Sequence, residues 1–168
     1  MTSTATPLNV LFLCTHNSGR SIMAEAMLNH LGKGRFKAYS AGSNPAQNQV
    51  PNSLALEALQ RAGVSIEGLS SKSWDIFGKS DAPHMDLVIT VCDDAAGEVC
   101  PIWPGHPAVA HWGMPDPSGT NVSEEDREEA FRKSLHLIAR RLDLLVNLPI
   151  ERLTKLTLEQ HVLEIAKH

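Results

Sequence analysis

The stretch NVLFLCTHNSGRSIMAEAML, which runs from Asn9 to Leu28, decides the fold. It begins as a short, continuous apolar run, which is typical of a strand buried on both faces of a parallel sheet. It ends with apolar residues that recur at helical spacing. Between the two lies a small polar loop that begins at Cys14 and ends at Arg20. We therefore expect a strand and a helix joined by a loop at the carboxyl edge of a parallel sheet.

Strand-like and helix-like segments alternate along the rest of the chain. The predicted strands are Leu8–Leu13, Phe36–Gly42, Asp86–Val91 and Ala108–Gly113. The predicted helices are Ser21–Leu31, Asn52–Ala62 followed by Gly63, and the run from Ser123 to Leu148. This order predicts a single α/β domain with a doubly wound parallel sheet. Proline and glycine concentrate at 97–119, which predicts a long loop region of the kind that often carries function.

The chain divides into three expected parts. Residues 1–7 form a tail, residues 8–147 form the domain, and residues 148–168 form a C-terminal helical extension. In the extension, Thr157 and Gln160 have the spacing of a capping box. An apolar stripe is expected from Leu158, Val162, Leu163 and Ile165. We expect this helix to dock on its own domain in a monomer, and a dimer contact through it is the alternative.

Composition limits the classes of partner. The chain has 168 residues, of which 42% are hydrophobic and 20% charged, a net charge of −4 and a pI near 6.0. These values are typical of soluble globular proteins and argue against nucleic acid or a membrane surface as the main partner. The opening MTSTATPLN lacks the pattern of a signal peptide. Three cysteines, an odd number, favour a reducing cytoplasm over a disulfide-stapled secreted fold.

The loop between Cys14 and Arg20 has the features of an anion-binding site. A loop that leads into a helix N-terminus aims several backbone N–H groups at one point, with the helix dipole behind them. The expected oxyanion-binding residues are Thr15, His16, Asn17, Ser18, Gly19 and Arg20. The guanidinium suits two oxygens of a tetrahedral anion, and the same field favours a Cys14 thiolate that the Ser21 hydroxyl could hydrogen-bond. A nucleophile and its electrophile would then share one site, and a buried structural cysteine is the alternative.

The segment VLFLCTHNSGRS resembles the C-x5-R-S phosphate-binding loop of the low-molecular-weight tyrosine phosphatase superfamily. Its members have one α/β domain, in which helices cover both faces of a central four-stranded parallel sheet. Their general acid is an Asp in an Asp-Pro loop far downstream, and Asp116 and Pro117 occupy the matching place here. The resemblance therefore implies that fold for this chain, with Cys14 as nucleophile and Asp116 as acid.

Two further cysteines distinguish the branches of this superfamily. A phosphatase hydrolyses its thiophosphate intermediate with one cysteine, whereas an arsenate reductase needs partner thiols to supply two electrons. Cys92 directly follows the predicted strand Asp86–Val91, so it should lie at the same sheet edge as Cys14. The stretch from Cys92 to Cys100 is similar to the redox segment of the three-cysteine, thioredoxin-coupled arsenate reductases, with one extra residue between the cysteines.

This second resemblance implies a thiol relay in cytoplasmic arsenic detoxification. Cys14 would attack arsenate while Asp116 protonates the departing oxygen, and Cys92 and then Cys100 would pass the disulfide to thioredoxin. A glutathione–glutaredoxin pair is the alternative reductant. The relay needs no metal or organic cofactor, and the chain has no C-x2-C pair of the kind that binds structural zinc.

Two other functions stay open at this point. In a low-molecular-weight protein tyrosine phosphatase, Cys14 would hydrolyse phosphate monoesters and the other cysteines would be incidental. Those phosphatases usually carry a tyrosine after Asp-Pro and an aromatic wall, but Ser118 stands here and SNPAQNQVP (43–51) has no aromatic residue. A small inorganic oxyanion suits such an opening better. A non-catalytic thiol sensor would bind the anion and signal through Cys92 and Cys100 without turnover.

A supporting group is expected behind the loop. By resemblance, Asn17 holds the loop through side-chain hydrogen bonds, and Glu25 and Ser40 lie behind it. In some relatives this group binds potassium with the help of an Asp, whose place Lys72 takes here. The Lys72 ammonium would replace the ion, which predicts activity without potassium, and a solvated loop lysine is the alternative.

Overall fold

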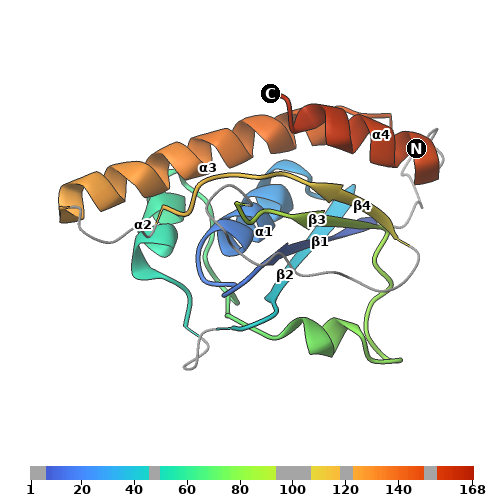
Figure 1. Ribbon diagram of the computed structural model, residues 1–168, viewed down its shortest axis with the longest axis horizontal. Coiled ribbons are helices and arrows are strands. Elements are labelled where there is room, and N and C mark those ends of the chain that lie inside the picture. Colours follow the sequence, from blue (N-terminus) through green and yellow to red (C-terminus); the bar gives the residue numbers. More distant parts are fainter. Residues whose placement is uncertain (1–6, 46–49, 94–106, 118–122, 150–154) are drawn as a thin grey trace.

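The computed structural model describes residues 7–45, 50–93, 107–117, 123–149 and 155–168. Within them lies a four-stranded, fully parallel sheet with strand order β2-β1-β3-β4 (Figure 1). Its strands are β1 (Leu8–Cys14), β2 (Phe36–Gly42), β3 (Leu87–Thr90) and β4 (Ala108–His111). All four predicted strands are confirmed, although β3 and β4 end one and two residues earlier than predicted. The sheet edge at which they end carries the candidate site.

Helical segments cover both faces of the sheet, as expected. The larger core lies on the face covered by α1 (Arg20–Leu31), α2 (Ser53–Arg61), α3 (Glu124–Val146) and α4 (Lys155–Ile165). The 3-10 helix η1 (Trp74–Phe77), which the sequence patterns did not predict, covers part of the other face. Figure 1 shows α3 and α4 above the sheet and η1 below it. The predicted α/β architecture is thus confirmed.

The continuous apolar run of β1 follows from its central place in the sheet. Val10 and Phe12 belong to the core under α1 and α3, and Leu11 and Leu13 belong to the core on the η1 face. All four side chains are fully buried. Because both faces of β1 are packed and both of its edges are paired, the chain delivers Cys14 to a fixed position at the strand end.

Side-chain caps define the starts of α2 and α3. Ser123 accepts a hydrogen bond of 3.1 Å from the backbone N–H of Asp126 at the start of α3. At the start of α2, the Asn52 side chain accepts one of 2.8 Å from Leu54 N–H. Gly63 follows the end of α2 with φ of +78°, a conformation that glycine adopts without strain. The predicted helix boundaries therefore hold to within one or two residues.

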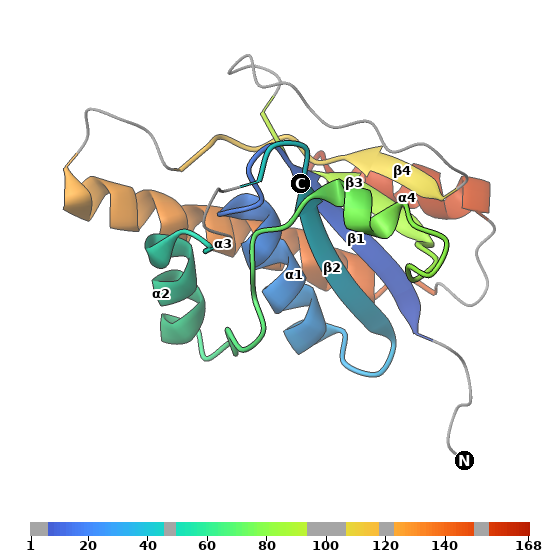
Figure 2. The same cartoon turned by 90° about the horizontal axis from the view of Figure 1, so that it is seen from below.

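The C-terminal helix α4 docks on the chain's own sheet beside the edge strand β4, as Figure 2 shows. Its buried residues are Leu158, Val162 and Ile165. Leu163 is 44% exposed, so its predicted place in the apolar stripe is wrong, because it follows Val162 by about 100° around the helix. The predicted capping box is also wrong, since Thr157 already has helical conformation within α4 (Lys155–Ile165). Packing against β4, rather than a cap at Thr157, determines this helix.

Candidate active site

The predicted nucleophile Cys14 ends β1, and the loop after it leads into α1 at Arg20. The Cys14 side chain is 3% exposed, and its sulfur lies 2.8 Å from the Ser21 hydroxyl oxygen. That oxygen accepts a hydrogen bond of 2.8 Å from the Asn17 side-chain amide. Because Asn17 donates to Ser21, the hydroxyl proton of Ser21 can point at the sulfur, an arrangement that stabilises a thiolate. Ser21 therefore lies where the sequence suggested, against the reactive sulfur.

Asn17 determines the shape of the loop. It is fully buried and has φ of +49°, a left-handed conformation that asparagine tolerates better than most residues. Its side-chain oxygen accepts a hydrogen bond of 2.8 Å from Lys72 N–H, and its carbonyl accepts one of 2.6 Å from the Ser71 hydroxyl. Ser71 was not predicted, because it comes from a distant segment and belongs to no motif.

The outer side of the loop is braced by backbone hydrogen bonds. The Thr15 carbonyl accepts one of 2.8 Å from Asn44 N–H, and the Ser18 carbonyl accepts one of 2.8 Å from Asn52 N–H. His16 is exposed, and its Nδ1 lies 3.1 Å from the Asn44 carbonyl oxygen. The predicted oxyanion loop is therefore tied to the segments that follow β2 and precede α2.

The end of β2 passes so close to this loop that only glycine fits. A Cβ on Gly42 would lie 2.6 Å from the Thr15 carbonyl oxygen, 2.9 Å from that of Cys14 and 3.0 Å from the Asn17 nitrogen. Gly42 N–H also donates to the Lys72 carbonyl over 2.9 Å. All three crowded atoms are backbone atoms, so they cannot rotate away as a flexible side chain would.

Gly42→Ala is expected to displace the loop. Inserting a methyl group against packed backbone should lower the free energy of unfolding by about 1–3 kcal/mol, and calorimetry should find weaker phosphate binding. Gly78→Ala is the matched control, because a Cβ there would meet the Asp75 carbonyl oxygen at 3.6 Å, an ordinary contact. A Gly42→Ala protein with native stability and native phosphate affinity would contradict this account of the loop.

Arg20 connects the loop to the predicted general acid. Its side chain is 5% exposed, and Nη1 donates to the Met114 carbonyl at 3.0 Å and to the Val91 carbonyl at 3.4 Å. Its Nη2 lies 3.9 Å from the Asp116 carboxylate, which is 41% exposed. Buried carbonyls thus orient the guanidinium, while the carboxylate beside it stays open to solvent and to a bound anion.

These groups line one small pocket at the carboxyl edge of the sheet. Its lining residues are Cys14, His16, Ser18, Gly19, Arg20, Asn52, Asp116 and Phe131. Phe131 was missed because no sequence pattern indicates which side of α3 meets the loop. Asn52 was missed because it comes from the start of α2, a segment distant in the sequence from Cys14. The Phe131 ring lies under the loop, where a Cβ on Gly19 would meet it at 3.4 Å, but it is only 1% exposed and belongs to the core, so the expectation of an opening without an aromatic wall stays a prediction.

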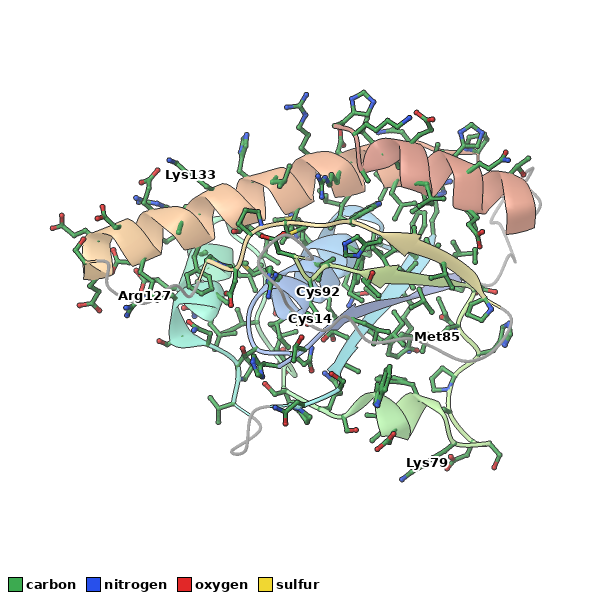
Figure 3. All side chains as sticks on the ribbon, viewed as in Figure 1. Cys14, Lys79, Met85, Cys92, Arg127 and Lys133 are labelled. Carbon is green, nitrogen blue, oxygen red and sulfur yellow. The ribbon has the colours of Figure 1, made fainter. Side chains whose placement is uncertain are left out.

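Cys92 lies at the same sheet edge as Cys14, as expected, and Figure 3 shows the two residues near each other. The pairing between β1 and β3 ends at Leu13 and Thr90. Cys14 comes one residue after Leu13, and Cys92 comes two residues after Thr90. Cys92 is fully buried and disulfide-bonded, whereas Cys14 is a free thiol. Cys100 lies outside the described residues, so its role stays a prediction.

Glu25, Ser40 and Lys72 meet behind the loop. Ser40 Oγ donates to the Glu25 carboxylate, and Lys72 Nζ lies 3.7 Å from the same carboxylate oxygen. Lys72 Nζ also donates to the Ser70 carbonyl at 2.6 Å. Burial raises the pKa of Glu25 and lowers the pKa of Lys72, and the attraction between their charges opposes both shifts. Lys72 therefore contacts the supporting group, and the alternative of a solvated loop lysine is wrong.

Known proteins resemble this chain over most of its length. Residues 9–159 match the family described as low molecular weight phosphotyrosine protein phosphatase, and the match ends inside α4. An arsenate reductase of Bacillus subtilis (strain 168) is 37% identical over 133 residues, which cover 79% of this chain and 91% of that protein.

Solved structures show the same architecture. An arsenate reductase from Archaeoglobus fulgidus DSM 4304 has a TM-score of 0.66 and 29% identity, over 83% of this chain and 99% of that chain. The thioredoxin-dependent arsenate reductase of Corynebacterium glutamicum has a TM-score of 0.53 and 30% identity, over 84% of this chain and 65% of that chain. The fold and the sequence therefore point to the same group of proteins.

Proposed function

This chain belongs to the low molecular weight phosphotyrosine protein phosphatase family, and from that premise we propose that it is an arsenate reductase that converts arsenate to arsenite. The observation that carries the proposal is the pair of cysteines at one sheet edge. Cys14 is a free thiol in the same pocket as Arg20, and Cys92, two residues beyond the end of the neighbouring strand β3, is disulfide-bonded. A hydrolase needs the first cysteine, but only a reductase needs the second. The arsenate reductases among the relatives support the same conclusion.

The first proposed step is attack of the Cys14 thiolate on arsenic. Arg20 would bind two oxygens of arsenate, and the backbone N–H groups of residues 15–20 would bind the others. As the S–As bond forms, one As–O bond breaks, and Asp116 gives the departing oxygen its proton so that water leaves. The Ser21 hydroxyl, 2.8 Å from the sulfur, would stabilise the thiolate before attack.

The second proposed step moves two electrons to arsenic. The Cys92 thiolate attacks the Cys14 sulfur, an S–S bond forms, and the electron pair of the broken S–As bond leaves with arsenite. The Cys100 thiolate then attacks Cys92, which releases the Cys14 thiolate and forms a Cys92–Cys100 disulfide. Thioredoxin reduces that disulfide by exchange. A free Cys14 beside a disulfide-bonded Cys92 matches the state that follows this exchange, and the order of the earlier steps rests on the resemblance to the three-cysteine reductases.

We further propose a cytoplasmic monomer with its catalytic domain over residues 8–147 and its extension over residues 148–168. Its substrate is a small oxyanion and its partner is thioredoxin, with a glutaredoxin as the alternative. The steps above use no metal and no organic cofactor. Among the described residues, no group of His, Cys, Asp and Glu side chains could hold a metal ion. In the same part of the chain, no helix has the length and apolar character that crossing a membrane requires.

The test is arsenate-dependent consumption of NADPH in the presence of thioredoxin and thioredoxin reductase. We expect steady turnover that stops when arsenate is left out. A parallel assay with glutathione and glutaredoxin identifies the reductant. If NADPH is not consumed with either reductant, the chain is not an arsenate reductase, and hydrolysis of an aryl phosphate then identifies a phosphatase.

A protein tyrosine phosphatase is the second candidate, and the family match over residues 9–159 is the observation that favours it. Phe131 lines the pocket with Cys14 and Asp116, but it is 1% exposed and packed in the core, so it offers little surface to a phenol ring. The anion loop alone does not distinguish phosphate from arsenate, so a slow aryl-phosphate hydrolysis is expected even from a reductase. The ratio of the two activities therefore decides between the candidates.

Replacement of the Lys72 ammonium tests the supporting group. We expect the native chain to turn over arsenate at the same rate in potassium and sodium buffers of equal ionic strength, because Lys72 already neutralises Glu25. Lys72→Met removes the charge, so potassium should then stimulate the reaction. Lys79→Met, at an exposed lysine in Figure 3, is the control. A large potassium stimulation of the native chain would overturn this assignment.

A further inference from the structure

Two arginines hold adjacent carbonyls in the segment that precedes the general acid. The Met114 carbonyl accepts a hydrogen bond from Arg20 Nη1 at 3.0 Å. The Gly113 carbonyl accepts one from Arg141 Nη1 at 3.3 Å. Asp116 follows two residues after Met114. The first arginine belongs to the anion loop, whereas the second comes from α3 and is not among the residues that line the pocket.

Arg141 also connects this segment to the C-terminal helix. Its Nη2 donates to the Ala166 carbonyl at 3.2 Å, directly after the end of α4. In the same region, Trp112 Nε1 donates to the Val162 carbonyl of α4 at 2.9 Å. The chain between β4 and Asp116 is therefore bonded to α3 and α4 on one side and to the anion loop on the other.

The burial of Arg141 indicates that these bonds matter. Its side chain is 7% exposed, whereas the adjacent Arg140 is exposed to solvent. Burying a guanidinium is costly unless its N–H groups are paired. Nη1 and Nη2 of Arg141 each donate to a carbonyl, whereas its buried Nε has no hydrogen-bond partner among the described residues. The carbonyl of Ala166 lies at the C-terminal end of α4, where the helix dipole favours a cation. An apolar side chain at this position would avoid the desolvation cost of a buried charge, so packing alone does not explain an arginine here.

We propose that Arg141 is a positioning residue that holds the segment Trp112–Met114 against α4 and so holds Asp116 over the anion pocket. The inference rests on the proposed function, in which Asp116 protonates the oxygen that leaves arsenic. General acids must lie within hydrogen-bond reach of the atom they protonate, so a small displacement of Asp116 removes most of its effect. The C-terminal extension is then part of the catalytic machinery, because α4 supplies the fixed carbonyl to which Arg141 is bonded.

A double-mutant cycle between Arg141 and Asp116 tests the proposal. Arg141→Met keeps a long apolar side chain and removes the hydrogen bonds, and it should lower the rate of arsenate turnover by about tenfold or more. In an Asp116→Asn background the same substitution should change the rate less than about twofold, because the acid that it positions is already absent. Arg141→Lys, which keeps the charge and one donor, should recover part of the loss. Arg140→Met is the matched control and should leave the rate unchanged.

Each outcome decides the proposal. Equal losses in the native and Asp116→Asn backgrounds would indicate a general structural role and overturn it, as would a native rate in Arg141→Met. If Arg141→Met does not fold by circular dichroism, the cycle is run with Arg141→Lys and the same criterion applies. If the native chain does not reduce arsenate, the proposed function fails instead, and the cycle is run on hydrolysis of an aryl phosphate, which also needs Asp116 as acid.

Discussion

Cys14→Ser is expected to reduce arsenate-dependent NADPH consumption to the rate measured without enzyme. A serine hydroxyl stays protonated near neutral pH, so the nucleophile is lost. Serine also cannot form the disulfide that gives arsenic its electrons, so no slower thiol route through this position is left. The loss should therefore be the largest of any single substitution, and it follows from the place of Cys14 at the end of β1 beside Ser21.

The control for Cys14→Ser is anion binding. Serine is only slightly smaller than cysteine, and the Arg20 contacts with Met114 and Asp116 do not depend on the sulfur. Calorimetric titration with phosphate should therefore find binding that is close to native. Turnover by Cys14→Ser at a measurable fraction of the native rate would contradict the assignment of the nucleophile.

Arg20→Lys is expected to have the next largest effect. Lysine keeps the charge but is a compact donor that cannot span two oxygens of the anion. It also lacks a second terminal nitrogen, so it cannot bond the Met114 and Val91 carbonyls as Nη1 does and face Asp116 as Nη2 does at the same time. Loss of such preorganised donors should lower kcat by about 10²–10³-fold, measured in the NADPH assay. The fold should survive, because β1 and α1 have their own core contacts.

Arg61→Lys is the control for charge alone. Arg61 is 56% exposed and pairs with Glu57 on the surface of α2, so its replacement by lysine should leave kcat unchanged. Near-native kcat in Arg20→Lys would mean that the guanidinium has no special role. In that case the anion would be bound mainly by the backbone N–H groups of the loop.

The parts of this molecule that the sequence predicted are those with a local signal. The apolar run of β1 predicts a central strand because both of its faces meet a core. Cys14 and Arg20 stand out because a strand precedes them and a helix follows, and Ser123 marks the start of α3 through a local hydrogen bond. Each of these features depends on residues close together in the chain.

The parts that were missed depend on long-range packing. Phe131 lines the pocket and Arg141 bonds the Gly113 carbonyl because both lie on the side of α3 that faces the sheet. The periodicity of the sequence alone does not show which side that is. Ser71 holds Asn17 across a separation of 54 residues. Leu163 has the same apolar character as Val162 but faces solvent, since β4 covers only one side of α4. The roles of such residues can be assigned only from the side-chain contacts in the folded structure.

The central claim is that Cys14, Cys92 and Cys100 act in that order, and one single-turnover measurement tests it most directly. Reduced native protein and its Cys92→Ser and Cys100→Ser variants are each mixed with excess arsenate without reductant, arsenite is quantified, and disulfides are mapped by mass spectrometry. The account predicts one arsenite per native chain with a Cys92–Cys100 disulfide, one arsenite with a trapped Cys14–Cys92 disulfide in Cys100→Ser, and no arsenite in Cys92→Ser. Arsenite release from Cys92→Ser equal to that of the native chain would contradict the relay.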